Sequence, residues 1–139
     1  MRTSKLAAFA ALTALTLLAG AAKATCTYPP APAKIPDGNT ATRDEMVAAK
    51  NDVAKYNADI TAYQSCIKLE SDNSIAELDK QTAGKSDDEK KALAAQKQEA
   101  ERKLVEKNNA ALDEVTAVVE RFNEQLRAFN KKNPPAAKK

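Results

Sequence analysis

The 139-residue sequence contains no histidine or tryptophan and only three glycines. Without histidine, Ser-His and Cys-His nucleophiles and histidine-containing zinc sites are excluded, and most hydrolase mechanisms are excluded with them. Three Tyr and three Phe are too few aromatic side chains for a thick globular core. The last glycine is Gly84, and the abundance of Ala, Lys, Glu and Gln favours long, exposed helices that share a narrow apolar seam.

The first 24 residues are typical of a secretory signal peptide. Two basic residues precede an apolar run over residues 6–18, and a small-x-small cleavage site follows at residues 22–24. The apolar run is shorter than a membrane span requires. We therefore predict cleavage between Ala24 and Thr25, a periplasmic or secreted protein, and no membrane insertion after cleavage.

The charge balance changes once this leader is removed. Three of the 22 Lys and Arg lie within the first 24 residues, and none of the 19 Asp and Glu does, which leaves 19 basic against 19 acidic residues. The basic excess of the full sequence therefore belongs to the targeting segment. Neither nucleic acid nor an anionic membrane surface is an expected partner.

Cys26 and Cys66 are the two cysteines of the chain. In an exported protein they predict one intramolecular disulfide, because the periplasm and the outside of the cell are oxidising. An intermolecular bridge and free thiols are the alternatives. Their wide separation is unlike the C-x-x-C spacing of redox-active sites.

Residues 25–41 contain four prolines followed by the turn sequence Asp37-Gly38-Asn39. Proline at this density favours an extended polyproline conformation, which spans roughly 50 Å over sixteen residues. Cys66 lies roughly 36 Å along the helix expected after this segment, so the bridge is within reach if the segment runs back along that helix as a strap. Tyr28 would then lie near Tyr63. A disordered leader is the alternative.

A first helix is predicted over residues 42–83. Thr42 and Glu45 form a capping-box pair at its start. Apolar residues then recur at alternating spacings of three and four, as on the buried face of a coiled coil: Met46, Ala49, Val53, Tyr56, Ile60, Tyr63 and Ile67. The pattern falters at residues 70–74, where a continuous or kinked helix is favoured over a break.

A turn at residues 84–85 and a second helix over residues 86–132 complete an antiparallel helical hairpin. Gly84 suits the end of the first helix, and Ser86 with Glu89 forms another capping box. The predicted seam of the second helix is Val105, Asn108, Leu112, Val115, Val119, Phe122, Leu126 and Phe129. Residues 133–139 are expected to form a disordered tail.

No group of residues predicts catalysis, a cofactor or a metal. Acidic runs occur at residues 44–45 and 87–89, where the first turn of a helix favours negative charge. Tyr56 and Tyr63 could offer a stacking platform to a ligand, but aromatic residues at heptad spacing are more often part of a packed seam. The chain is therefore not expected to be an enzyme.

The run from residue 35 to residue 66 resembles small exported helical proteins of proteobacteria, through Ile35-Pro36-Asp37-Gly38, Ala41-Thr42, Glu45-Met46, Val53, Tyr56, Tyr63 and Cys66. The resemblance covers about a third of the chain and implies a periplasmic location and no activity. The expected hairpin is also similar in architecture to the Skp-type and Spy-type periplasmic chaperones. The strong basic charge of the first and the L-T-x-x-Q motif of the second are absent from this sequence.

These features predict an all-α, coiled-coil-like hairpin with a proline-rich strap linked to its first helix by the disulfide. The expected function is a non-enzymatic structural or protein-interaction module of the cell envelope, with partners that the sequence does not identify. A homodimer would close a four-helix bundle over the remaining apolar faces. The alternative function is a holdase-type chaperone for unfolded or envelope proteins.

Overall fold

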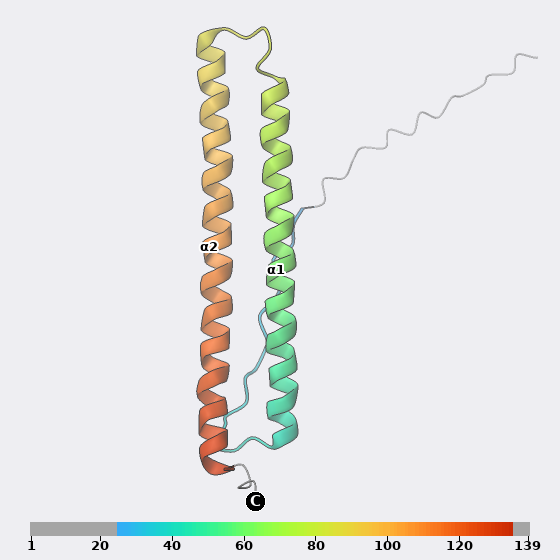
Figure 1. Ribbon diagram of the computed structural model, residues 1–139, viewed down its shortest axis with the longest axis vertical. Coiled ribbons are helices and arrows are strands. Elements are labelled where there is room, and N and C mark those ends of the chain that lie inside the picture. The colour runs from blue at the N-terminus through green and yellow to red at the C-terminus, as the bar shows by residue number, and fades with distance from the viewer. Residues whose placement is uncertain (1–24, 135–139) are drawn as a thin grey trace, which may run out of the picture.

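A computed structural model describes residues 25–134. Two helices account for most of this range: α1 spans Arg43–Lys80 and α2 spans Asp87–Lys132. They lie side by side and antiparallel as a long hairpin (Figure 1). No strand occurs within residues 25–134, and no helix there is long and apolar enough to cross a membrane. The predicted signal peptide (1–24) and most of the predicted tail (133–139) lie outside the described residues.

Both helices begin where the capping boxes predicted. The Thr42 hydroxyl accepts a hydrogen bond from the Glu45 backbone N–H, and the Glu45 carboxylate accepts one from the Thr42 N–H. Ser86 and Glu89 make the same reciprocal pair at the start of α2. Because each box satisfies two backbone N–H groups that have no partner within the helix, these pairs set the two starting points.

The first helix ends earlier than expected. It stops at Lys80 rather than at residue 83, and residues 81–84 form a turn that contains Gly84 with φ of 73°. Glycine adopts this left-handed conformation without a steric penalty. Through residues 70–74 the helix continues without interruption, as favoured by the sequence.

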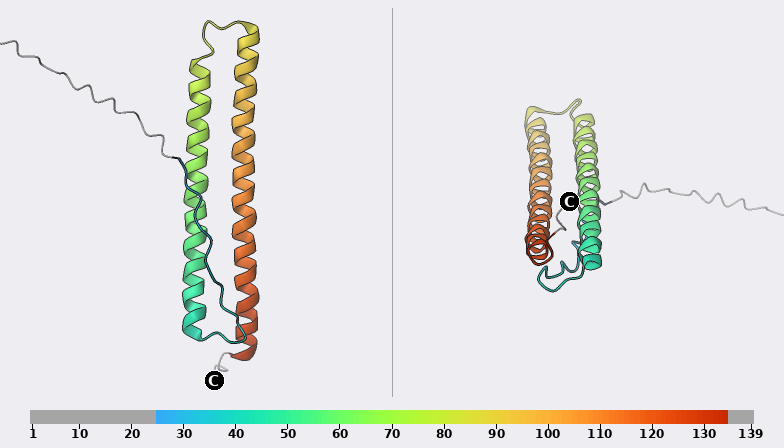
Figure 2. Two further views of the ribbon diagram at one scale, coloured as in Figure 1. Left: turned by 180° about the vertical axis from the view of Figure 1, so that it is seen from behind. Right: turned by 60° about the horizontal axis from the view of Figure 1, so that its bottom comes forward.

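The N-terminal segment, residues 25–41, has no regular secondary structure and crosses one face of the hairpin. It starts beside the middle of α1 and runs along the hairpin toward the end of α2, before the chain turns into α1 (Figures 1 and 2). Cys26, Ala31 and Ile35 from this segment pack against the buried core. The hairpin therefore has one face occupied by its own N-terminal segment and one that this segment leaves open.

The core is a single layer of side chains between the helices. On α1 it follows the predicted seam, including Tyr56, Ile60 and Ile67, which are at most 2% exposed. On α2 the prediction was partly wrong. Leu112 is 46% exposed and Val105 56% exposed, whereas Ala111 and Val118 are fully buried.

The buried face of α2 is turned toward the N-terminal segment relative to the predicted face. Val115 and Phe122 are buried as predicted and form one row of the seam. The second buried row is Ala111 and Val118, each one residue before its predicted counterpart. It lies on the side of α2 that the N-terminal segment contacts through Glu114 and Gln125. The row that was predicted to be buried, because its side chains are bulkier, lies on the other side of α2. There Val119 and Leu126 are half-buried.

Candidate interaction site

The disulfide marks the upper end of the N-terminal segment. Cys26 and Cys66 are bonded, with their Cα atoms 5.8 Å apart, which confirms the predicted pairing. Two residues further on, the ring of Tyr28 meets that of Tyr63 edge-on, with centroids 5.0 Å apart. This contact was also predicted. Edge-on aromatic pairs contribute beyond the area they bury, so the segment is held by a covalent and a packing contact within three residues.

All three tyrosines of the chain belong to this region. The Tyr28 hydroxyl donates a hydrogen bond of 2.7 Å to the Glu114 carboxylate on α2. Burial and that hydrogen bond raise the pKa of Tyr28, and burial also raises the pKa of Tyr56. Both hydroxyls therefore stay protonated at neutral pH. The Tyr28 hydroxyl donates to Glu114, whereas the Tyr56 hydroxyl is buried without a hydrogen-bond partner among the described residues.

The lower end of the segment is held by backbone contacts. The Gly38 N–H donates to Oε1 of Gln125 at 2.9 Å, and Nζ of Lys132 donates to the Asn39 carbonyl at 2.5 Å. A Cβ atom at Gly38 would overlap the Gln125 carbonyl and lie 2.8 Å from the Phe129 nitrogen. Only glycine allows the chain to approach α2 this closely.

An apolar stripe runs along α2 on the face that the N-terminal segment leaves open. It consists of residues at seven-residue intervals, which share one side of a helix: Val105, Leu112, Val119 and Leu126. The first two are among the most exposed large apolar residues of residues 25–134, and the last two are half-buried. We call this set the α2 stripe.

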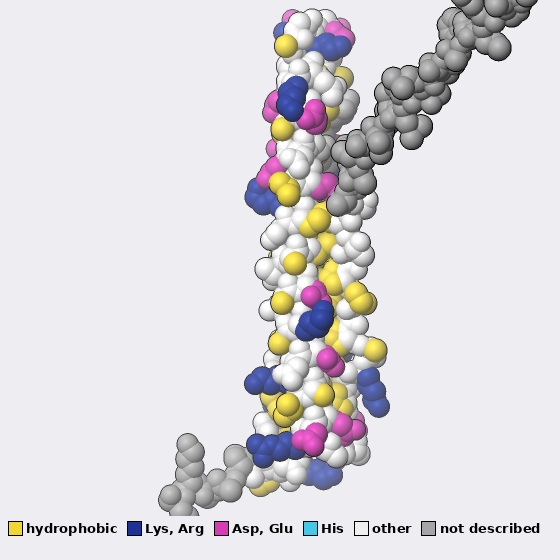
Figure 3. Space-filling view, turned by 90° about the vertical axis from the view of Figure 1, so that its right-hand side faces the viewer, with side chains coloured by type: hydrophobic (Ala, Val, Ile, Leu, Met, Phe, Trp, Pro, Cys, Tyr) yellow, Lys and Arg dark blue, Asp and Glu magenta, His cyan; other side chains and the backbone are white. Residues whose placement is uncertain are grey.

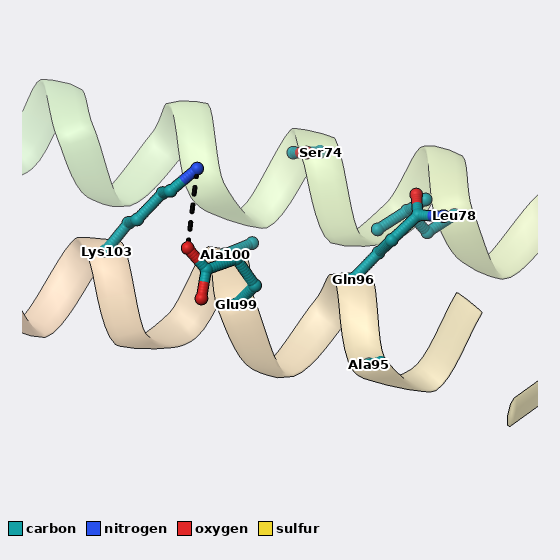
Figure 4. A pocket seen from close by; sticks show the side chains of 7 residues that line it. All are labelled: Ser74, Leu78, Ala95, Gln96, Glu99, Ala100 and Lys103. Carbon is teal, nitrogen blue, oxygen red and sulfur yellow. Dashed lines mark ion pairs between the residues drawn. The ribbon is translucent and has the colours of Figure 1, made fainter. Parts of the chain in front are cut away.

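A second feature lies toward the turn between the helices. There an open depression of about 520 Å³ is lined by Ser74 and Leu78 of α1 and by Ala95, Gln96, Glu99, Ala100 and Lys103 of α2. Lys103 and Gln96 rise from α2 toward α1, and Lys103 pairs with Glu99 at 3.5 Å (Figure 4). A smaller depression of about 170 Å³ adjoins it at Ile67, Ser71, Leu104 and Lys107.

Charged side chains are mostly exposed, and most of their ion pairs join residues three or four positions apart. Examples are Lys55 with Asp59 and Lys68 with Asp72, each four residues apart, whereas Lys97 pairs with Asp79 across the hairpin. Figure 3 shows Lys and Arg side chains interspersed with Asp and Glu along the length of the molecule, with apolar side chains exposed between them. Such exposed pairs contribute little to stability.

One acidic residue in the first turn of each helix, Glu45 in α1 and Glu89 in α2, belongs to the capping box. Hydrogen bonds from the Thr42 backbone and hydroxyl lower the pKa of Glu45, and those from Ser86, with Lys85, lower the pKa of Glu89. Within residues 25–134 no group of three or more Asp, Glu or Cys side chains is placed to hold a metal ion.

The structure brings most of the predicted seam residues together. Those that are buried are Met46, Ala49, Val53, Tyr56, Ile60, Tyr63, Ile67, Val115 and Phe122, and those packed at the edge of the core are Val119, Leu126 and Phe129. Sequence reasoning missed Ala111, Val118, Glu114 and Ser71. The buried residues of α2 follow one another at spacings of four, three and four, as regularly as the predicted seam does: Ala111, Val115, Val118 and Phe122. Spacing alone therefore does not distinguish the two possible buried faces.

Comparisons of the chain with protein-family models, curated proteins and solved structures find no match.

Proposed function

We propose that the chain is a non-enzymatic structural or protein-interaction module that works in the periplasm or outside the cell after residues 1–24 are removed. The observation that carries the proposal is the α2 stripe. A hairpin that leaves large apolar side chains at regular intervals on one face presents a surface suited to another protein. N-terminal sequencing of the exported protein tests the processing step, and Thr25 is the expected first residue.

In this proposal residues 25–41 act as a strap that stabilises the hairpin. Support comes from both ends of the segment. One end is held by the disulfide and by the contact of Tyr28 with Tyr63, and the other by the close contact of Gly38 with α2. A two-helix layer buries little apolar surface for its length. The strap adds a third layer over one face, and so lets the other face be used for binding.

We further propose that the partner on the α2 stripe is a second copy of the chain. The stripe extends over residues 105–126, which corresponds to about 32 Å of helix at about 1.5 Å per residue. Two hairpins packed over that length at helix spacings of about 10 Å would bury an area of the order that specific interfaces require, about 800 Å² per partner. The product is a four-helix bundle whose two outer faces carry the straps.

Sedimentation of the purified protein at micromolar concentrations tests this dimer. We expect the wild type to dimerise and Leu112→Glu to be monomeric, because the substitution places a charge in the interface. Leu69→Glu is the matched control, since Leu69 is 62% exposed and lies outside the stripe. A wild type that stays monomeric at every concentration, or a Leu112→Glu variant that dimerises as well as the control, would refute the dimer.

A holdase-type chaperone is the second candidate, and the open depression near the turn favours it. A groove between two helices that is not filled by the chain's own side chains can accept a segment of an unfolded client. Suppression of the aggregation of a model client at stoichiometric amounts would support this function. Unchanged aggregation would argue against it.

A further inference from the structure

The groove between α1 and α2 is divided at the disulfide. From Cys66 toward the start of α1 the N-terminal segment covers it, and from Ile67 onward it is open. Both stretches face the same way. On α1, Glu70 of the open stretch follows Cys66 of the covered stretch by four residues. On α2, Lys107 of the open stretch precedes Glu114 of the covered stretch by seven residues. Residues at these spacings share one side of a helix.

The covered stretch shows what this groove accepts. The segment in it is extended, rich in proline and alanine, and not helical. Its small side chains, such as Ala31, pack on the core, while the Tyr28 hydroxyl reaches an acidic residue on the rim of α2. Polyproline segments bind at low entropic cost because they are already extended.

The open stretch continues the groove toward the turn between the helices. Its floor consists of small or aliphatic side chains, among them Ser74 and Ala100, and its rim carries Lys103 and Lys107. Ser71 lines it and is 8% exposed, and its hydroxyl has no hydrogen-bond partner among the described residues. A buried hydroxyl without a partner is costly, and the backbone of an extended peptide would supply one.

We propose that this open stretch, residues 67–78 of α1 and 95–107 of α2, is a docking site for an extended, proline- and alanine-rich segment of a partner protein. The segment would continue the path of residues 25–41 toward the turn. This goes beyond the proposed dimer, which uses the opposite face, so either can fail without the other.

The test uses a fluorescent peptide with the sequence of residues 27–36, TYPPAPAKIP, and the oxidised full chain. Fluorescence anisotropy should show saturable binding, and a peptide with every proline replaced by glycine should bind more weakly. Ala100→Arg fills the groove and should abolish binding. Ala94→Arg is the matched control, because Ala94 is an exposed alanine of α2 outside the lining, and should bind like the wild type.

Ser71→Ala separates binding from folding. Removing a buried hydroxyl that has no partner should leave the melting temperature unchanged or raise it. It should also lower the affinity for the peptide about fivefold, through the loss of one hydrogen bond. No saturable binding to the wild type, or equal binding to the Ala100→Arg and Ala94→Arg variants with both folded by circular dichroism, would overturn the proposal. Equal binding of the glycine peptide would overturn the preference for proline.

Discussion

Breaking the Cys26–Cys66 bond should remove a large part of the stability of the hairpin. The bond joins residues separated by 40 positions. In the chain-entropy model, closing a loop of that length restricts the unfolded chain by about 4 kcal/mol at 25 °C. The whole margin of a small domain is about 5 to 15 kcal/mol, so this single constraint is comparable to the net stability of a thin two-helix layer.

The corresponding change in melting temperature can be estimated from the size of the folded region. An unfolding entropy of about 2.1 cal/mol/K per residue over residues 25–134 converts about 4 kcal/mol into a decrease of about 17 °C. The folded state should lose more than the bond, because Tyr28 is held against Tyr63 only when the segment stays in place. The estimate is therefore a minimum for the reduced protein.

Thermal unfolding followed by circular dichroism, with and without dithiothreitol, measures this effect. The Cys26→Ser, Cys66→Ser double variant should melt like the reduced wild type and should not respond to dithiothreitol. If reduction shifts the melting temperature by no more than a few degrees, the segment does not act as a strap and that part of the proposed function is wrong.

Three further results are expected. Ile60→Ala should lower the free energy of unfolding by about 2–5 kcal/mol, because Ile60 is 1% exposed and the truncation leaves a cavity; chemical denaturation measures it. Gly38→Ala should cost about 1–3 kcal/mol through overlap with the α2 backbone. In an alkaline titration followed by ultraviolet absorbance, Tyr28 and Tyr56 should ionise above their ordinary pKa of 10.0; the stability they contribute is complete below that pH and is lost as the pH rises through their higher folded-state values.

Each of these has a control in the same chain. Leu69→Ala changes an exposed residue of α1 and should cost much less than Ile60→Ala; equal losses would contradict the single-layer core. Gly84→Ala meets no atom within 4 Å, so any loss there comes from its positive φ alone, and it should leave the contacts of the N-terminal segment intact. Ionisation of Tyr28 and Tyr56 at their ordinary pKa would show that these two hydroxyls are open to solvent.

The sequence was sufficient for the features that depend on neighbouring residues. Thr42 with Glu45 and Ser86 with Glu89 start the two helices through hydrogen bonds three residues apart, so their chemistry can be recognised locally. The seam of α1 was predicted because its bulky apolar residues recur on a single face of the helix. The pairing of Cys26 with Cys66 followed from there being two cysteines in a chain expected to be exported.

The tertiary structure alone decided which side of α2 is buried. Ala111 precedes Leu112 and Val118 precedes Val119, so two adjacent rows are apolar and both keep the heptad spacing. The N-terminal segment lies on the side of α2 where Ala111 and Val118 are buried. The bulkier residues of the α2 stripe lie on the other side, where two are exposed and two are half-buried. Hydrophobic spacing indicates that a helix has a buried face. Which of two adjacent apolar rows is buried depends on where a third element packs. In this protein that element is an extended segment whose path depends on a disulfide and on one close approach at Gly38.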